Sequence, residues 1–277
     1  MDLPAFRKTV REIILPLGFT AIGLGFAFLL KKLLHLDLSK LELSVIAFIV
    51  TSISVLWLFP RVFKIPFGKV SISNFVKKVG LKKPKRVYLF VLLGVIAAFF
   101  TLSGMLLGSI LTGKYIFSFS TITVTQAVFS LTPGIWEEVL CRGVIMIVVL
   151  RITKSYKKAL IIQIFLFGIV HIKGIDLLSF VDAFSVVIIA IAFTYIALKT
   201  KSLIPGIIFH YLHDTLLFAV QLPDDNYIGF YDNALFYSAL WLSVAISIVV
   251  VKKLVEKYSI VSDYDFYKEG SGIEYKF

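Results

Sequence analysis

Long, uninterrupted apolar runs are the feature that most limits how this chain can fold. Eight runs suit helical membrane spans, at about 13–30, 43–59, 87–111, 124–150, 158–172, 177–198, 202–222 and 235–255. Roughly 20 apolar residues carry a helix across a bilayer core. Only 17% of the residues are charged, whereas about a quarter are charged in soluble domains. The sequence therefore predicts an all-α, polytopic integral membrane protein with about eight transmembrane helices.

The chain contains no internal repeat or low-complexity tract, which favours a single membrane domain over residues 1–277. Residues 61–86 mix apolar and basic residues with Pro and Gly, which is typical of a cytoplasmic interfacial segment. Residues 258–277 lack a long apolar run and are predicted to form a mobile tail. The first apolar run leads into a Lys-rich stretch and not into a cleavage site, so we expect a retained helix and not a signal peptide.

The net charge of +12 comes from Lys and Arg residues gathered in alternate connections between the apolar runs. They precede the first run, fill 61–86, lie at 151–158 and 199–201, and follow the last run, whereas the other connections carry few. Basic residues concentrate in cytoplasmic loops, which predicts that both termini are cytoplasmic. The surplus charge is then expected to contact anionic lipid headgroups of the bilayer and not nucleic acid.

Ionisable side chains interrupt the apolar runs at only a few positions, most of them in the second half of the chain. The main ones are Glu137, Glu138, Arg142, His171, His210, His213 and Asp214. A charge at the centre of a membrane helix costs about 2.5–3.5 kcal/mol, so these groups are expected to be paired or to face a wet cavity. At the helical rise per residue, Glu137 and His171 lie roughly 20 Å from the cytoplasmic end. His210 lies at about 12 Å and Asp214 at about 18 Å, and these overlapping depths predict one shared site.

The two adjacent glutamates are expected to have different roles. Glu137 and Glu138 differ by about 100° around an α-helix, so they cannot both face the same point. Glu138 and Arg142 form an i, i+4 pair with the acid first, which predicts an internal ion pair that holds this helix in place. Glu137 has no obvious local partner and is the better candidate for a general base.

Pro133 and Gly134 lie just before the glutamates and suggest that the helix restarts there, with Thr132 as its N-cap. Glu137 would then lie close to irregular backbone, which is tolerated at membrane depth only beside protein or water.

In the apolar run at 202–222, His210 and Asp214 share one helical face, as their i, i+4 spacing requires. An imidazole with a carboxylate one turn away is suited to oxyanion stabilisation or proton transfer. His213 lies off that face and is expected to have a supporting or interfacial role. Asp182 lies near the outer end of its run and is expected at the membrane interface, and His35 in an outer loop has no obvious role.

Three stretches resemble the motifs of the CPBP intramembrane proteases, a family that includes the type II CAAX prenyl endopeptidases and the bacterial Abi proteins. "EEVLCR" is similar to E-E-x-x-x-R, "FGIVH" to F-x-x-x-H, and "HYLHD" to H-x-x-x-N/D. They occur in the family's order on three separate predicted helices, within residues 132–214.

The resemblance implies an intramembrane endopeptidase that cuts a prenylated protein after its lipidated cysteine, releasing the C-terminal three residues. We expect this reaction to need no cofactor. It also implies that Glu137 and His171 activate a water, and that His210 and Asp214 stabilise the oxyanion. Many relatives carry asparagine where this chain has Asp214. An aspartate there donates a hydrogen bond only when protonated, and otherwise it orients His210 and stabilises its charged form.

Other chemistries remain open at this point. Glu137, His171 and His210 could bind a catalytic zinc, which normally takes three protein ligands and a water. Cys141, four residues after Glu137, could be a thiol nucleophile, although cysteine is also a common apolar filler. A pair of catalytic aspartates, Asp182 and Asp214, lacks the expected G-x-G-D sequence. A catalytically silent scaffold or immunity protein, or a proton-coupled transporter, would also use buried ionisable groups.

Overall fold

The computed structural model describes residues 40–63, 71–172, 174–221 and 229–272. The predicted span at 13–30 and His35 therefore lie outside the described residues, as do 64–70 of the predicted interfacial segment.

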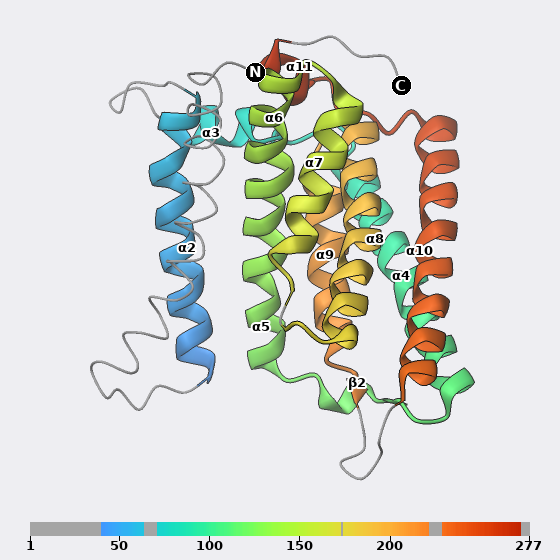
Figure 1. Cartoon of the computed structure of the whole chain (residues 1–277). Coiled ribbons are helices and arrows are strands. Elements are labelled where there is room, and N and C mark those ends of the chain that lie inside the picture. Colours follow the sequence, from blue (N-terminus) through green and yellow to red (C-terminus); the bar gives the residue numbers. More distant parts are fainter. Residues whose placement is uncertain (1–39, 64–70, 173, 222–228, 273–277) are drawn as a thin grey trace.

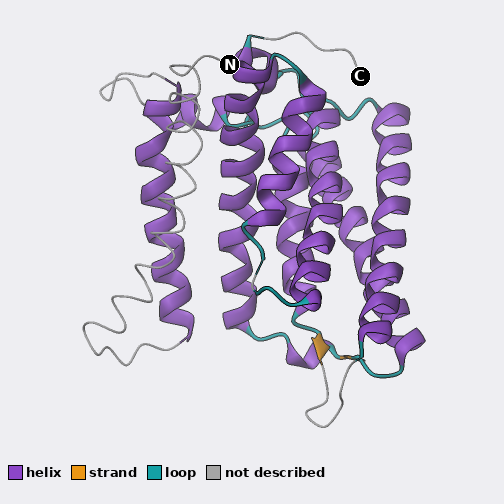
Figure 2. Cartoon of the chain, viewed as in Figure 1, coloured by secondary structure: helices purple, strands orange, loops and turns teal. Residues whose placement is uncertain are grey.

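The described chain is a bundle of helices that run side by side (Figure 1), joined by short connections and one small pair of strands (Figure 2). The helices are α2 (Lys40–Phe63), α3 (Ile72–Lys78), α4 (Val87–Thr112), η2 (Phe119–Thr121), α5 (Val124–Thr132), η3 (Pro133–Ile145), α6 (Met146–Thr153), α7 (Tyr156–Ile169), α8 (Leu177–Thr200), α9 (Ile204–Leu217), α10 (Phe230–Tyr258) and α11 (Phe266–Ser271). The strands β1 (Ile116–Phe117) and β2 (Val220–Gln221) pair antiparallel, with Ile116 opposite Gln221. The predicted all-α class is confirmed.

Seven of the eight predicted spans coincide with helices, but their lengths differ from the prediction. Among the described residues, α4, α8 and α10 are long and apolar enough to cross a membrane. The helices α7 and α9 have 14 residues each, so they extend about 21 Å and fall short of a bilayer core of about 30 Å. The predicted spans at 158–172 and 202–222 are thus only partly helical, and eight membrane crossings remain a prediction.

Side-chain caps fix where several of these helices begin. Thr123 and Gln126 form a reciprocal capping box at the start of α5. The Ser155 hydroxyl accepts a hydrogen bond from the Lys158 amide at the start of α7. Asp176 caps α8 in the same way, and hydrogen bonds from the hydroxyl and the amide of Ser179 lower the pKa of this carboxyl. These local contacts set the helix starts around the polar residues.

The segments α5, η3 and α6 form one continuous helix over residues 124–153, and the middle segment η3 is π-helical. Within it, the Met146 amide donates to the carbonyl of Cys141, five residues earlier. Thr132 has right-handed helical dihedrals and makes no side-chain cap, so the predicted restart at Pro133 is wrong. The helix continues through Pro133 without a break, because its hydrogen-bond pattern changes at this residue from α-helical to π-helical.

The two ends of the bundle differ sharply in charge. One end, here called the basic end, carries α3, the turn from α6 to α7, the turn from α8 to α9, and α11 (Figure 1). Its Lys and Arg residues include Lys77, Lys78, Lys82, Lys83, Lys85, Arg86, Arg151, Lys154, Lys157, Lys158, Lys199, Lys201 and Lys257. The opposite end, here called the sheet end, carries β1 and β2, and among the side chains that the structure describes its cation is Lys114. The grouping of basic connections predicted from the sequence is therefore present in space.

The predicted mobile tail is wrong for the part that the structure describes. Residues 259–272 cross the basic end and finish in α11, where Phe266 and Tyr267 are fully buried. The ring of Phe266 packs against Gly80, and Gly270 lies against Ile147 in α6. Aromatic side chains in this short segment bury enough apolar surface to hold it on the bundle without a long apolar run.

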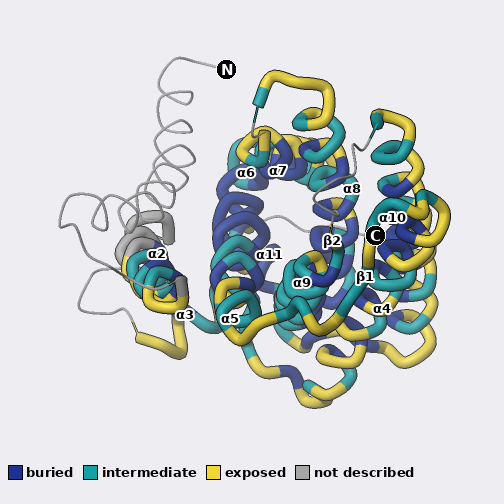
Figure 3. Tube along the Cα trace, turned by 90° about the horizontal axis from the view of Figure 1, so that it is seen from below, coloured by how far each residue is buried: buried dark blue, intermediate teal, exposed yellow. Residues whose placement is uncertain are grey.

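The apolar interior falls into two clusters, one around η3, α6 and α7 and the other around α4, α8, α9 and α10. Figure 3 shows buried residues facing the inside of the bundle and exposed residues facing outward. The helices α4 and α10 pack closely through small residues. A Cβ built on Gly104 would lie 2.9 Å from the Leu240 backbone and 2.8 Å from Ser243 Cβ. No side chain fits there without separating the two helices.

We therefore expect Gly104→Ala to lower the free energy of unfolding by about 1–3 kcal/mol, because the added methyl group overpacks the contact between α4 and α10. Ser103→Ala, at the partly exposed neighbouring position of the same helix, is the matched control and should change the free energy of unfolding by less than about 0.5 kcal/mol. Denaturant unfolding of the purified protein in detergent measures both. Equal stability of the two variants would contradict the proposed packing.

Candidate active site

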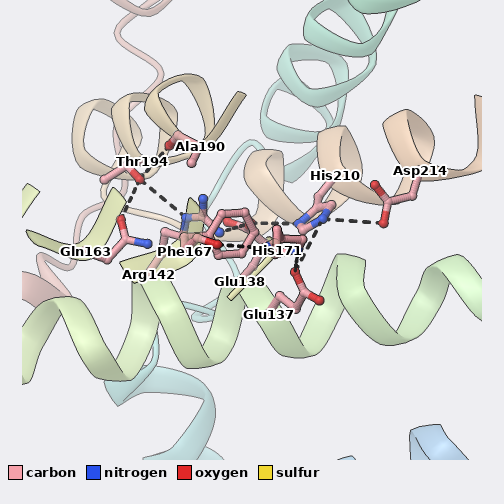
Figure 4. A network of polar contacts seen from close by, with 10 residues as sticks. All are labelled: Glu137, Glu138, Arg142, Gln163, Phe167, His171, Ala190, Thr194, His210 and Asp214. Atoms are coloured by element: carbon pink, nitrogen blue, oxygen red, sulfur yellow. Dashed lines mark hydrogen bonds and ion pairs between the residues drawn. The ribbon is translucent and has the colours of Figure 1, made fainter. Parts of the chain in front are cut away.

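Three helical segments bring the predicted site residues together in the middle of the bundle (Figure 4). The Oε2 atom of Glu137, on η3, lies 3.8 Å from Nε2 of His171, which follows the end of α7. The same oxygen lies 3.9 Å from Nε2 of His210 on α9. The side chains of Glu137 and His171 are 29% and 30% exposed, but the Oε2 atom itself is buried and has no hydrogen-bond partner among the described residues. The predicted convergence of these three residues is present.

Glu138 contacts two partners through one carboxylate oxygen. Its Oε1 accepts a hydrogen bond of 2.8 Å from Nη1 of Arg142, and both side chains are fully buried. The same oxygen accepts a second hydrogen bond, of 2.9 Å, from Nδ1 of His210. The predicted ion pair is therefore present, but it also supports the imidazole of His210, which the sequence did not suggest.

The two adjacent glutamates thus approach the same ring from its two nitrogen atoms. Glu138 lies at Nδ1 of His210 and Glu137 lies near its Nε2. The two carboxylates face different atoms of this ring, which agrees with the expectation that neighbouring positions on a helix point in different directions.

Space for the buried carboxylate comes from a glycine on α9. A Cβ built on Gly206 would lie 3.1 Å from Oε2 of Glu138. Gly134 similarly lets η3 approach α9, because its Cβ would lie 2.9 Å from Cβ of Tyr211. These two close approaches hold η3 and α9 near enough for Glu138 to reach His210.

The position of His171 is fixed by its own helix end. Its Nδ1 lies 2.7 Å from the carbonyl oxygen of Phe167, which can only accept a hydrogen bond, so Nδ1 carries the proton. In the neutral ring, Nε2 then has a free lone pair and faces Glu137. The ring also packs against Phe167, with the centroids 4.6 Å apart.

His210 is held on all sides. The carboxylate of Glu138 accepts the hydrogen bond from Nδ1, and Oδ2 of Asp214 lies 3.5 Å from Nε2, one helical turn further along α9. The ring of Phe193 stacks on the imidazole at a centroid distance of 4.5 Å and an angle of 20°. His210 is only 4% exposed, so its orientation is set by these neighbours and not by solvent.

The guanidinium of Arg142 contacts an aromatic ring and a hydroxyl in addition to Glu138. Its Cζ lies 4.2 Å from the ring centroid of Phe167, and its Nε donates to the Thr194 hydroxyl at 3.4 Å. The Thr194 hydroxyl in turn lies 2.9 Å from Oε1 of Gln163. Gln163, Thr194 and Phe193 were not predicted from the sequence as part of the site. Gln163, a polar residue inside an apolar run, was the available signal.

A cavity of about 660 Å³ adjoins this cluster. Its lining residues are Thr51, Phe129, Ser130, Thr132, Pro133, Trp136, Glu137, Phe167, His171, Val186, Ile189, Phe193, His210, His213, Asp214, Leu217 and Phe218. All four predicted catalytic residues line it, and the rest are mainly apolar and aromatic. The volume falls within the range of about 300–1,000 Å³ that is usual for ligand sites.

The remaining candidates lie apart from this arrangement or at its edge. His213 lines the cavity at 4% exposure, and its Nδ1 has no hydrogen-bond partner among the described residues. Cys141 is buried at 6% exposure and is not part of the cavity wall. Asp182 accepts a hydrogen bond from the Tyr237 hydroxyl and is likewise outside the wall. Within the described residues, no three His, Cys, Asp or Glu side chains form a group that could hold a metal ion.

A comparison with known protein families matches the segment that contains these site residues. Residues 119–216 match a family model described as type II CAAX prenyl endopeptidase Rce1-like. This segment contains all three motifs, and the match confirms the resemblance predicted from them. The match and the three long apolar helices together indicate a membrane protein. No curated protein and no solved structure matches the chain.

Glu138→Gln should lower the free energy of unfolding by about 3–5 kcal/mol, because it leaves the buried Arg142 guanidinium without its counter-charge. Glu137→Gln is the matched control at the adjacent position. It is partly exposed and makes only long contacts, so we expect a change within about 1 kcal/mol. Denaturant unfolding in detergent compares the two, and an equal loss in both would refute the distinct roles of the glutamates.

Proposed function

We propose that this protein, which carries a type II CAAX prenyl endopeptidase Rce1-like domain at residues 119–216, is a glutamate-dependent intramembrane endopeptidase. Its proposed substrate is a prenylated C-terminal peptide or protein, cut after the lipidated cysteine to release a C-terminal tripeptide. The observation that carries the proposal is the meeting of Glu137, His171 and His210 at the wall of a cavity inside an apolar bundle.

Water activation is the first proposed step. The separations of 3.8 Å and 3.9 Å around Glu137 are too long for direct hydrogen bonds and suit a water held between the groups. The Glu137 carboxylate and the Nε2 lone pair of His171 both accept protons, so together they can orient a water and remove its proton as it attacks the peptide carbonyl. The family resemblance supports the same two residues.

Oxyanion stabilisation is the second proposed step. When Nε2 of His210 is protonated, it presents an N–H to a tetrahedral oxyanion formed in the cavity. Glu138 and Asp214 then lie on either side of the charged imidazole and stabilise it. In this proposal Asp214 acts through His210 as a carboxylate, although an asparagine in its position would donate a hydrogen bond itself.

Glu138 and Arg142 act as positioning residues in this scheme. The buried ion pair holds the carboxylate that fixes the Nδ1 proton of His210, and therefore leaves its Nε2 facing Glu137. Peptide hydrolysis needs such fixed donors, because dipoles that are already oriented require no reorganisation as charge develops.

We further propose that the protein needs no cofactor and that its basic end lies at the cytoplasmic face, with both termini cytoplasmic. The concentration of Lys and Arg at one end supports this orientation. The orientation also fits a single, multi-pass membrane domain, as the apolar runs suggest.

Replacing the proposed base tests the mechanism directly. Glu137→Gln should lower kcat for cleavage of a farnesylated C-terminal peptide by about 10²–10⁴-fold, because the amide cannot accept the proton of the attacking water. Cys141→Ala is the control and should cleave at the rate of the unchanged protein. Rapid cleavage by Glu137→Gln, or loss of cleavage in Cys141→Ala, would overturn the proposal. A folded protein with no cleavage at all would favour a scaffold or a proton-coupled transporter.

Removal of metal ions is an independent test of the water-activating step. Because Glu137 and His171 can together take up the proton of the water, we expect full peptide cleavage after exhaustive chelation followed by dialysis. The rate of peptide cleavage before and after chelation is the measurement. Loss of activity that added Zn²⁺ restores would instead support a zinc-dependent hydrolase.

A further inference from the structure

We propose that Thr51, Thr132 and Trp136 form a subsite of the cavity that binds the main chain of the substrate peptide through hydrogen bonds, across the cavity from an apolar wall on α8. The inference rests on the proposed peptidase function and adds to it where the peptide part of the substrate is held.

The three residues lie together on one wall of the cavity. Thr132 on α5 and Trp136 on η3 both line the cavity and are four residues apart, about one turn, on one continuous helix. Thr51 lines the cavity from α2, which packs against α5 and η3. Phe48, about one turn before Thr51, contacts the indole of Trp136 with the ring centroids 5.9 Å apart. This contact places Thr51 on the side of α2 that faces Trp136.

The polar atoms of these residues are buried and have no hydrogen-bond partner among the described residues. They are Oγ1 of Thr51, Oγ1 of Thr132 and Nε1 of Trp136. Thr51 and Thr132 are 1% and 5% exposed, so bulk water does not take the place of a partner. A helical hydroxyl can donate to the carbonyl one turn earlier, as Ser130 does to Gln126 on the same helix. The two threonines make no such bond, and each can turn its hydroxyl toward an occupant because threonine adopts two χ1 rotamers in a helix.

Unpaired polar groups at a cavity wall favour an occupant that supplies their partners. Burial of such a group without a partner is unfavourable, and a ligand that pairs it recovers that cost. An indole N–H only donates and a hydroxyl both donates and accepts, which matches the alternating C=O and N–H groups of a peptide main chain. No Lys or Arg lines the cavity, so these neutral groups suit uncharged amides. Trp136 directly precedes Glu137, and a main chain held at this wall therefore passes the proposed base.

The wall on α8 has the opposite character. Val186, Ile189 and Phe193 line the cavity from this helix, and all three are apolar. The helix α8 packs against α7, α9 and α10, and Figure 3 shows it on the other side of α5 from α2. The lipid chain of a prenylated peptide fits the α8 wall, because burial of apolar surface is favourable there. The peptide part is then left to the wall that carries the unpaired polar groups.

Thr132→Val tests the subsite, because it replaces the hydroxyl with a methyl group at almost the same volume. We expect it to raise KM for a farnesylated peptide by about five- to thirtyfold, since a peptide group loses its partner, and to leave kcat nearly unchanged. Thr51→Val should act in the same direction. Neither variant should lower the denaturant midpoint of unfolding, because no hydrogen bond within the protein is lost. Steady-state kinetics and denaturant unfolding in detergent are the measurements.

Ser130→Ala is the matched control. Ser130 also lines the cavity, but its hydroxyl is already bonded to the carbonyl of Gln126, so its removal should leave KM unchanged. Thr132→Ser keeps a hydroxyl and should restore most of the affinity for the peptide. A farnesyl thioether without a peptide, used as a competitor, should bind the unchanged protein and Thr132→Val equally well.

An unchanged KM in Thr132→Val, or an equal rise in Ser130→Ala, would overturn the inference, as would weaker binding of the thioether to Thr132→Val. Binding of a non-hydrolysable farnesylated peptide is a measurement that needs no catalysis. If the protein cleaves no peptide but Thr132→Val selectively weakens this binding, the proposed function fails while the subsite is supported. If the protein cleaves and neither threonine variant changes KM, the subsite fails alone.

Discussion

The site depends on one buried carboxylate, that of Glu138. It lies in an apolar bundle, where an isolated charge is costly, and it is stabilised by Arg142 on its own helix and by His210 on α9. Because both partners share one oxygen, a shift of the carboxylate toward one of them lengthens its contact with the other. The ion pair therefore joins the two helices and fixes the ring that faces Glu137.

The close approach of η3 and α9 makes this arrangement possible. Gly134 and Gly206 allow the two helices to approach, so Glu137 and Glu138, which leave η3 in different directions, reach the two nitrogen atoms of one imidazole. A buried carboxylate that orients the ring and a second, partly exposed side chain that faces the opposite nitrogen thus come from neighbouring positions in the sequence.

Much of this could be predicted from the sequence, and the reasons are physical. Apolar runs give the helices, and the constant rise per residue places Glu137, His171 and His210 at similar depths. Hydropathy does not register where a helix ends, so the stop of α7 at Ile169 was missed within a run that stays apolar to Ile172. Hydropathy also does not distinguish a π-helix from an α-helix, because a π-helix needs no particular composition. Tyr267 is buried through packing with distant segments, which no local pattern records.

The short helix α7 determines where His171 lies. Its end presents His171, because the ring folds back onto the carbonyl of Phe167 only where the helix stops supplying hydrogen bonds. A helix that continued past Ile169 would give the carbonyl of Phe167 a backbone partner, and it would remove the contact that turns His171 toward Glu137. The end of α7 therefore positions one proposed catalytic group.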